Sequence, residues 1–160
     1  MKKKFLALAL TAVMALSLAA CGGDTQTSGD TSTDDTASGD GQTYTVGIIQ
    51  QMQHEALDAA TEGFQAALTE KLGDSVTIEF ENASGDPSNY STIANNFVSQ
   101  GVDLIMANGT SALQAASTAT STIPILGTSI TEYGVALGID GFEDTTGFNV
   151  SGTSDLAPLE

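Results

Sequence analysis

The feature that most constrains the fold is a repeated switch between strand-like and helix-like hydrophobic patterns from residue 44 onward. Segment 44–50 becomes a nearly continuous apolar run, as in a strand buried within a parallel sheet. The next segment, 57–72, places apolar residues at steps of three and four, which predicts a helix that ends near Gly73. Strands that alternate with helices through short connections predict an α/β fold with a parallel sheet and helices on both faces.

The same alternation continues along the chain. Further strands are predicted at 76–81, 102–107 and 123–127. Asp86 followed by Pro87 predicts the start of a second helix, and Gly101 predicts its end. An alanine-rich helix is expected after the turn at 108–111, running to about Thr120. Beyond it, several glycines interrupt any long helix, and 149–153 is a candidate final short strand.

The N-terminus has the three parts of a secretory signal peptide, which we assign to residues 1–20. Lysines occupy positions 2–4, an apolar stretch covers 5–18, and small residues precede Cys21. The apolar stretch is shorter than the roughly 20 residues of a membrane-spanning helix, so we expect cleavage. Leu18-Ala19-Ala20-Cys21 resembles the bacterial lipobox, which implies lipidation of Cys21 and anchoring to the extracytoplasmic face of the cell membrane. In the alternative interpretation, Cys21 is an ordinary thiol.

The segment after the cysteine has nothing to bury. Between residues 22 and 43, Ala37 is the only apolar residue among Gly, Asp, Thr, Ser and Gln. Such a segment cannot offset the entropy lost on ordering. We therefore expect residues 21–43 to be a lipidated cysteine with a disordered acidic tether, and 44–160 to be the folded part.

The charge balance excludes whole classes of partner. The chain has 20 acidic residues and four lysines, of which three belong to the signal peptide. One lysine, Lys71, then faces 20 acids, a formal charge of −19. Nucleic-acid binding needs clustered Lys and Arg, so we expect no nucleic-acid partner. A neutral, zwitterionic or cationic small molecule suits this field better than an anion.

Catalytic motifs are absent from the sequence. It contains no Gly-x-Ser-x-Gly, no phosphate-binding glycine run and no cysteine besides Cys21. His54 is the single histidine, so the usual ligand set of a metal site is lacking. We expect neither enzyme activity, catalytic residues, metal nor cofactor. A lipid-anchored flavodoxin-like enzyme remains an alternative, although its phosphate loop is not matched by Gln50-Gln51-Met52-Gln53.

Several segments, taken in their order and spacing, resemble the substrate-binding lipoproteins of ABC transporters of the tryptophan and tyrosine type. The matching segments are Val46-Gly47-Ile48-Ile49-Gln50, His54-Glu55-Ala56-Leu57-Asp58, Gly63-Phe64, Asn82 with Gly85-Asp86, Val102-Asp103-Leu104-Ile105-Met106-Ala107, Gln114-Ala115-Ala116, Ile123-Pro124-Ile125, and Asn149-Val150-Ser151-Gly152 running into Ser154-Asp155. Two loops depart from the family pattern, Glu132-Tyr133 and 108–111.

The resemblance implies a periplasmic-binding-protein-like (type I) architecture of two α/β lobes with the ligand held between them. Residues 44–160 would be the N-terminal lobe, with the second lobe missing from this chain. The implied function is capture of a small zwitterion and its delivery to a membrane permease. The expected zwitterion is an amino acid, and an aromatic amino acid is one option. A receptor for another solute, such as a sugar, is the alternative within the same fold.

Candidate ligand residues follow from the predicted sheet. In open parallel sheets, ligands bind beyond the carboxyl ends of the strands. Together with the segment at the end of the resemblance, the loops at these ends contain twelve candidate ligand residues: Gln50, Gln51, His54, Asn108, Gly109, Thr110, Ser111, Thr128, Ser129, Thr131, Ser154 and Asp155.

Specific roles are proposed for a few of these residues. The free N–H groups at 109–111 open a helix and form a place for a carboxylate, because the mature chain has no arginine. Ser111 could instead only cap its helix, and His54 could only start the helix that follows it. Asp155 or Glu132 could meet a ligand ammonium group, while the remaining polar side chains could merely close turns.

Overall fold

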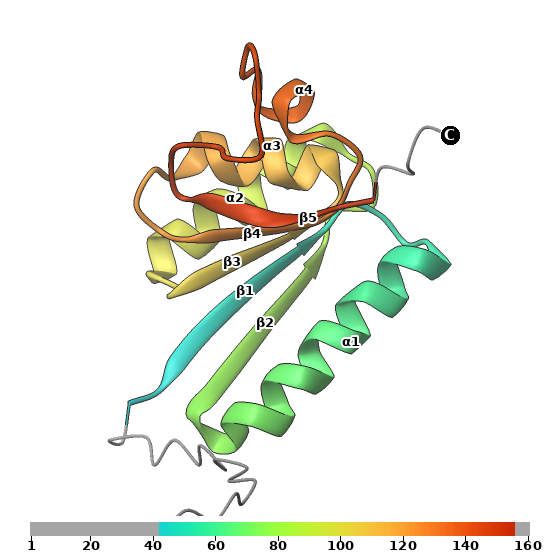
Figure 1. Cartoon of the computed structure of the whole chain (residues 1–160). Helices are drawn as coiled ribbons and strands as arrows, with labels where there is room; N and C mark the ends of the chain where they lie inside the picture. Colours follow the sequence, from blue (N-terminus) through green and yellow to red (C-terminus); the bar gives the residue numbers. More distant parts are fainter. Residues whose placement is uncertain (1–41, 156–160) are drawn as a thin grey trace, which may run out of the picture. The chain divides into compact units, whose positions relative to one another are not determined.

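The computed structural model describes residues 42–155, which form a five-stranded sheet between helices (Figure 1). The elements, in chain order, are β1 (Tyr44–Gln50), α1 (Glu55–Leu72), the 3-10 turn η1 (Gly73–Ser75), β2 (Val76–Asn82), α2 (Pro87–Gln100), β3 (Leu104–Asn108), α3 (Thr110–Ala119), β4 (Ile125–Ile130), α4 (Tyr133–Leu137) and β5 (Val150–Ser154). The predicted signal peptide, Cys21 and nearly all of the predicted tether lie outside the described residues.

The sheet has the strand order β2-β1-β3-β4-β5, and every neighbouring pair is parallel. This order confirms the predicted α/β class. The chain first moves outward from β1 to β2 and then returns to β3 on the other side of β1. The gap between β1 and β3 is therefore the topological switch point, where open α/β sheets bind ligands.

Apolar residues cover both faces of the sheet, so the core has two parts. The larger part lies between the sheet and α2, α3 and α4, and includes Phe97, Ile105 and Leu113. The smaller part lies under α1, where Val46, Ile48 and Met106 meet Phe64 and Leu68. Figure 1 shows α1 on one face of the sheet and α2 with α3 on the other. Burial on both faces explains the continuous apolar run of β1.

The helix signals predicted at both ends of α2 are confirmed. Asp86 is the N-cap, and its carboxylate accepts hydrogen bonds from the hydroxyl and the backbone N–H of Ser88, which lower its pKa. Pro87 occupies the first helical position. Gly101 adopts the left-handed conformation with φ of 70° and ends the helix.

Two strands start two residues later than predicted, each for a local reason. Val102 was expected to start β3, but its N–H donates to the carbonyl of Phe97 as part of the helix C-cap, and β3 starts at Leu104. Ile123 was expected to start the fourth strand, but the strand begins after Pro124, which lacks an N–H, and continues past Gly127 to Ile130.

In the described part of the chain, no helix is both long and apolar enough to cross a membrane.

Candidate functional site

A row of polar residues crosses the sheet at the carboxyl ends of its strands. Asn82 of β2 pairs with Gln50 of β1, Gln50 with Asn108 of β3, and Asn108 with Thr128 of β4. Residues that pair in register project to the same face of a parallel sheet. Three predicted candidates, Gln50, Asn108 and Thr128, therefore lie side by side at this edge of the sheet, next to Asn82, which was not among the candidates.

Two members of the row are buried and bonded to α1. Gln50 is 1% exposed; its Nε2 donates to the carboxylate of Asp58 at 2.6 Å, and its Oε1 accepts from the hydroxyl of Thr61 at 2.7 Å. Asn108 is 0% exposed, and its Nδ2 donates to the carbonyl of Leu57 at 2.7 Å and to the Thr61 hydroxyl at 2.9 Å. These side chains tie the first turns of α1 to the sheet. A ligand contact through them stays a prediction.

One atom of this cluster has no hydrogen-bond partner. Among the described residues, Oδ1 of Asn108 is buried and accepts no hydrogen bond. A buried polar atom without a partner costs about 1–3 kcal/mol, and such atoms in native proteins call for an explanation such as a functional role. This one lies at the end of β3, beside the switch point.

The loop after β1 is held on three sides, and Gln51 is its central residue. The N–H of Gln51 donates to the carbonyl of Asn108 at 2.9 Å. Its own carbonyl accepts from the N–H of Gly85 at 2.9 Å and from the hydroxyl of Tyr90 at 3.1 Å. Its side-chain Oε1 accepts from the N–H of Ser111 at 3.1 Å, at the start of α3. The side chain of Gln51 thus lies where we expect a carboxylate to bind.

Because Gly109 has no side chain, the side chain of Gln51 can reach the start of α3. Gly109 is the N-cap of α3, and the helix begins at Thr110, within the turn that was predicted at 108–111. Gly109 has φ of 106°, and a Cβ there would lie 2.7 Å from both Cβ and Oε1 of Gln51. Its N–H donates to the carbonyl of Thr128 at 3.0 Å, which joins the loop after β3 to strand β4.

His54 occupies the N-cap of α1. Its Nδ1 accepts from the N–H of Ala56 at 3.2 Å, and the residue is exposed. The structure therefore shows the capping role that was the alternative for His54. The ring remains accessible at the carboxyl edge, so the ligand role stays a prediction.

The remaining candidates form a second group where β4 and β5 end. The hydroxyl of Ser154 donates to the carbonyl of Thr131 at 2.8 Å, and the N–H of Asp155 donates to the carbonyl of Ile130 at 2.9 Å. The hydroxyls of Thr128 and Thr153 lie 3.5 Å apart. Ser129 has φ of 56°, a left-handed conformation that is uncommon outside glycine. The Asp155 side chain is exposed and accessible to a ligand.

Glu132, the alternative partner for an ammonium group, has a local task. Both of its carboxylate oxygens cap α4, one accepting from the N–H of Gly134 at 2.7 Å and the other from that of Val135 at 2.6 Å. Each oxygen of Glu132 thus accepts one charge-assisted bond, which holds the side chain at the start of α4. Asp155 is thus the better placed of the two acids.

Sequence reasoning missed two tyrosines that support the site. Tyr90 fixes the loop after β1 through its hydroxyl, as described above. Tyr133 donates its hydroxyl to the carbonyl of Gly127 at 2.9 Å and approaches that of Thr153 at 3.3 Å. Burial raises the pKa of Tyr133, while its contact with the Thr153 backbone lowers it. The one signal in the sequence was the departure from the family pattern at Glu132-Tyr133, which drew attention to Tyr133 but not to Tyr90.

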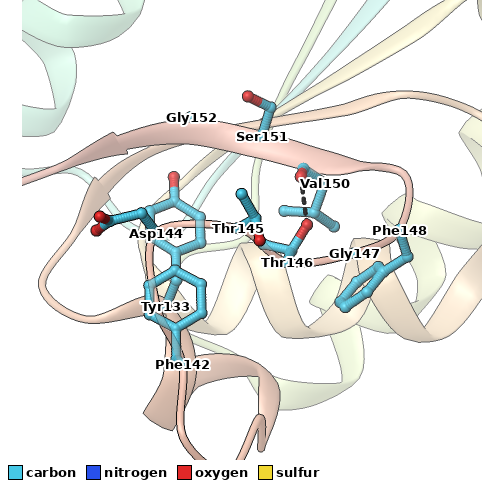
Figure 2. A pocket seen from close by; sticks show the side chains of 10 residues that line it. All are labelled: Tyr133, Phe142, Asp144, Thr145, Thr146, Gly147, Phe148, Val150, Ser151 and Gly152. Carbon is cyan, nitrogen blue, oxygen red and sulfur yellow. Dashed lines mark hydrogen bonds between the residues drawn. The ribbon is translucent and has the colours of Figure 1, made fainter.

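A cavity of about 290 Å³ lies beside β5 (Figure 2). Its lining includes Tyr133, Phe142, Phe148 and Val150. The rings of Tyr133 and Phe142 stack with centroids 6.4 Å apart.

Within residues 42–155, no group of three or more His, Cys, Asp or Glu side chains is arranged to hold a metal ion.

Known proteins with similar sequences support the α/β fold and show which family the chain resembles. A family model described as "ABC transporter substrate binding protein" matches residues 45–160. A tyrosine-binding protein of Clostridioides difficile is 36% identical over 162 residues, which cover 99% of this chain and 46% of that protein. The chain thus spans about half the length of this curated relative.

Two solved structures are similar in both sequence and fold. One is a ligand-free, open substrate-binding protein with adhesive properties from Clostridium difficile, with a TM-score of 0.66 and 40% identity over 72% of this chain and 40% of that one. The other is an ABC domain from Streptococcus pneumonia in complex with L-Trp, with a TM-score of 0.66 and 32% identity over 72% of this chain and 39% of that one.

Proposed function

Because the chain belongs to the family of ABC transporter substrate binding proteins, whose members bind solutes and are not enzymes, we propose that it captures an amino acid outside the cytoplasm and delivers it to a membrane permease. One observation carries the proposal: the polar loops after β1 and β3 are hydrogen-bonded to each other and to Thr128 of β4 at the carboxyl edge of the sheet. That edge contains the switch point of the strand order.

The favoured ligand is a zwitterion with an aromatic side chain. The start of α3 offers a carboxylate the hydroxyls of Thr110 and Ser111, together with the N–H of Ser111 once the ligand displaces the Gln51 amide oxygen that accepts from it. The exposed carboxylate of Asp155 is available to an ammonium group. A relative is named for tyrosine and a similar structure holds L-Trp, and both facts support an aromatic amino acid.

The chain's charge supports a ligand that brings its own cation. With 20 acidic residues and one lysine after the signal peptide, a purely anionic ligand would meet a repulsive field. A zwitterion is repelled less strongly by the acidic chain, because its ammonium group is attracted to the acidic residues while its carboxylate lies at a helix N-terminus.

Anchoring through Cys21 is part of the proposal. The signal peptide at 1–20 and the acidic tether at 21–43 would place the folded part on the extracytoplasmic face of the cell membrane. A permease in the same membrane would then be within reach of a tethered receptor, since a flexible tether raises the local concentration of its partner.

A second lobe completes the proposed site. Good small-molecule sites bury roughly 70–90% of the ligand surface, and residues 128–131 and 151–155 of the described edge are largely half-buried or exposed. The matched tyrosine-binding protein is about twice as long as this chain. We therefore place the ligand between this edge and a second α/β lobe supplied by a full-length gene product.

The deciding experiment is calorimetric titration of the full-length gene product with L-tyrosine and L-tryptophan. Tyrosinamide, which lacks the carboxylate, and N-acetyltyrosine, which lacks the ammonium group, are matched controls. We expect the free amino acids to bind and each blocked form to bind at least about tenfold more weakly, a loss of about 1.4 kcal/mol. Binding of a sugar but of no amino acid would overturn the ligand class. Equal binding of tyrosine and both blocked forms would overturn the assigned contacts.

A further inference from the structure

The ladder between β4 and β5 contains a bulge at the edge of the site. Gly127 pairs with Gly152, and Ile130 pairs with Ser154. Two residues of β4, 128 and 129, therefore lie opposite one residue of β5, Thr153. The left-handed backbone of Ser129, with φ of 56°, accommodates the extra residue of β4. Bulges are enriched beside functional sites, where they redirect side chains.

The hydroxyl of Tyr133 occupies this interruption. It donates to the carbonyl of Gly127 at 2.9 Å, just before the bulge, and lies 3.3 Å from the carbonyl of Thr153, opposite the bulge. Figure 2 shows the hydroxyl end of Tyr133 pointing toward β5. Backbone carbonyls buried at a bulge need a donor from elsewhere, and this hydroxyl supplies one.

Both strands make room for that hydroxyl by carrying glycine. A Cβ on Gly127 would lie 2.5 Å from the hydroxyl oxygen of Tyr133. A Cβ on Gly152 would overlap the same oxygen and the carbonyl oxygen of Gly127. The arrangement therefore depends on three residues from β4, α4 and β5 together.

Tyr133 is itself held from several directions. Glu132 caps the helix that Tyr133 begins. Gln114 of α3 donates its Nε2 to the carbonyl of Ala136 at 2.9 Å, which fixes α4 against α3. Phe142 stacks on the ring of Tyr133. Because Tyr133 is 6% exposed and supported on each of these sides, its hydroxyl has a defined position.

We propose that Tyr133 is a positioning residue for the ligand site, acting through the bulge that carries Thr128 and Ser129. The proposal rests on the proposed function, because it assigns Tyr133 to the same carboxyl edge. Two backbone hydrogen bonds flank the bulge: the N–H of Gly109 to the carbonyl of Thr128 at 3.0 Å, and the N–H of Asp155 to the carbonyl of Ile130 at 2.9 Å. Through them, the bulge sets where the loop after β3 and the end of β5 lie.

The test compares Tyr133→Phe with Tyr44→Phe in the full-length gene product. Tyr44→Phe is the matched control, because Tyr44 begins β1 at the opposite end of the sheet. Hydrogen exchange of the Gly109 and Asp155 amides is followed by NMR, and affinity for L-tyrosine by calorimetry. For Tyr133→Phe we expect exchange at both amides to become at least about tenfold faster and affinity to fall about tenfold, while the Phe97-centred core keeps its protection.

The outcomes separate positioning from simple packing. Unchanged exchange at Gly109 and Asp155 in Tyr133→Phe would overturn the proposal, as would faster exchange with unchanged affinity. Uniformly faster exchange throughout the lobe would assign Tyr133 a general structural role and overturn it too. If the unaltered protein binds no amino acid, the proposed function fails, whereas selectively faster exchange would still support the hold of Tyr133 on the bulge.

Discussion

Gln51 caps the start of α3 from the neighbouring loop: its side-chain Oε1 accepts a hydrogen bond from the N–H of Ser111 at 3.1 Å. The contact joins the carboxyl ends of β1 and β3 across the switch point of the sheet. It also puts an uncharged acceptor where the proposed ligand carboxylate would lie. Ligand binding at this helix start must therefore include or displace the amide of Gln51.

Replacing Gln51 with Glu should separate stability from binding. A carboxylate at a helix N-terminus is favourable by roughly 0.3–1 kcal/mol, so the melting temperature should hold or rise. The same charge should repel a ligand carboxylate and lower the affinity for L-tyrosine at least about tenfold. Calorimetry and thermal unfolding of the full-length gene product measure both. Unchanged affinity in Gln51→Glu would place the carboxylate site elsewhere.

Replacing Gly109 with Ala should affect both folding and binding. With φ of 106°, the position is one that side chains rarely adopt, so we expect a loss of about 1–3 kcal/mol of stability. The new Cβ would also push the Gln51 side chain from Ser111. Gly63→Ala in α1 is the control, since its Cβ would meet nothing within 4 Å and Ala favours helix by about 0.5–1 kcal/mol. Urea unfolding checks the prediction, which an equal effect of the two variants would contradict.

Replacing Asn108 with Asp should destabilise the fold strongly at neutral pH. The change removes the amide donors to Leu57 and Thr61 and buries a carboxylate without a cation. We expect a loss of about 3 kcal/mol or more at pH 7. Because burial raises a carboxyl pKa above its unfolded value of about 3.9, part of that loss should be recovered as the pH falls toward 5.

Asn82→Asp is the matched control for that experiment, at the edge of the same polar row. Its Oδ1 accepts from the N–H of Ser84 at an exposed position, and a carboxylate can do the same. Denaturant melts at pH 7 and pH 5 should therefore show little change for Asn82→Asp. Similar losses for the two variants would mean that the Asn108 cluster does not tie α1 to the sheet.

Stability should fall at high pH through Tyr133. Burial raises its folded pKa above the unfolded value of about 10. The stability contributed by the neutral hydroxyl is therefore fully present below pH of about 10 and is lost as the pH rises through the higher folded pKa. The stability difference between the unaltered protein and Tyr133→Phe should shrink as the pH rises above about 10. A difference that stays constant as the pH rises, measured by urea melts, would show that the pKa of Tyr133 is the same in the folded and unfolded states.

Replacing Cys21 with Ser should release the protein from the membrane fraction. In the proposed anchoring, the lipobox-like sequence directs acylation of Cys21, and one or two acyl chains would supply the membrane affinity. Cell fractionation together with labelled palmitate incorporation measures the effect, with Ser28→Ala in the tether as the control. A membrane-bound, labelled Cys21→Ser protein would refute the lipoprotein assignment.

The order and type of the main elements could be predicted from local patterns. The alternation of hydrophobic periods predicted every long helix and strand of residues 44–130, and the pair Asp86-Pro87 with Gly101 predicted both ends of α2. A parallel sheet places all strand carboxyl ends at one edge, so the general location of the candidate site followed from the sequence as well. These features depend on interactions within a few residues along the chain, which is why local reasoning reached them.

Only the tertiary structure decided which of the polar candidates are internal and how the edge is built. Gln50 and Asn108 are buried and hydrogen-bonded to α1, and Asn108 meets Thr61 from 47 positions away. The bulge at residues 128–129 exists because β4 pairs with β5 out of step, and Tyr133 can fill it because Gly127 and Gly152 leave space. Such contacts join residues distant in sequence, and their geometry is set by packing, which no local pattern contains.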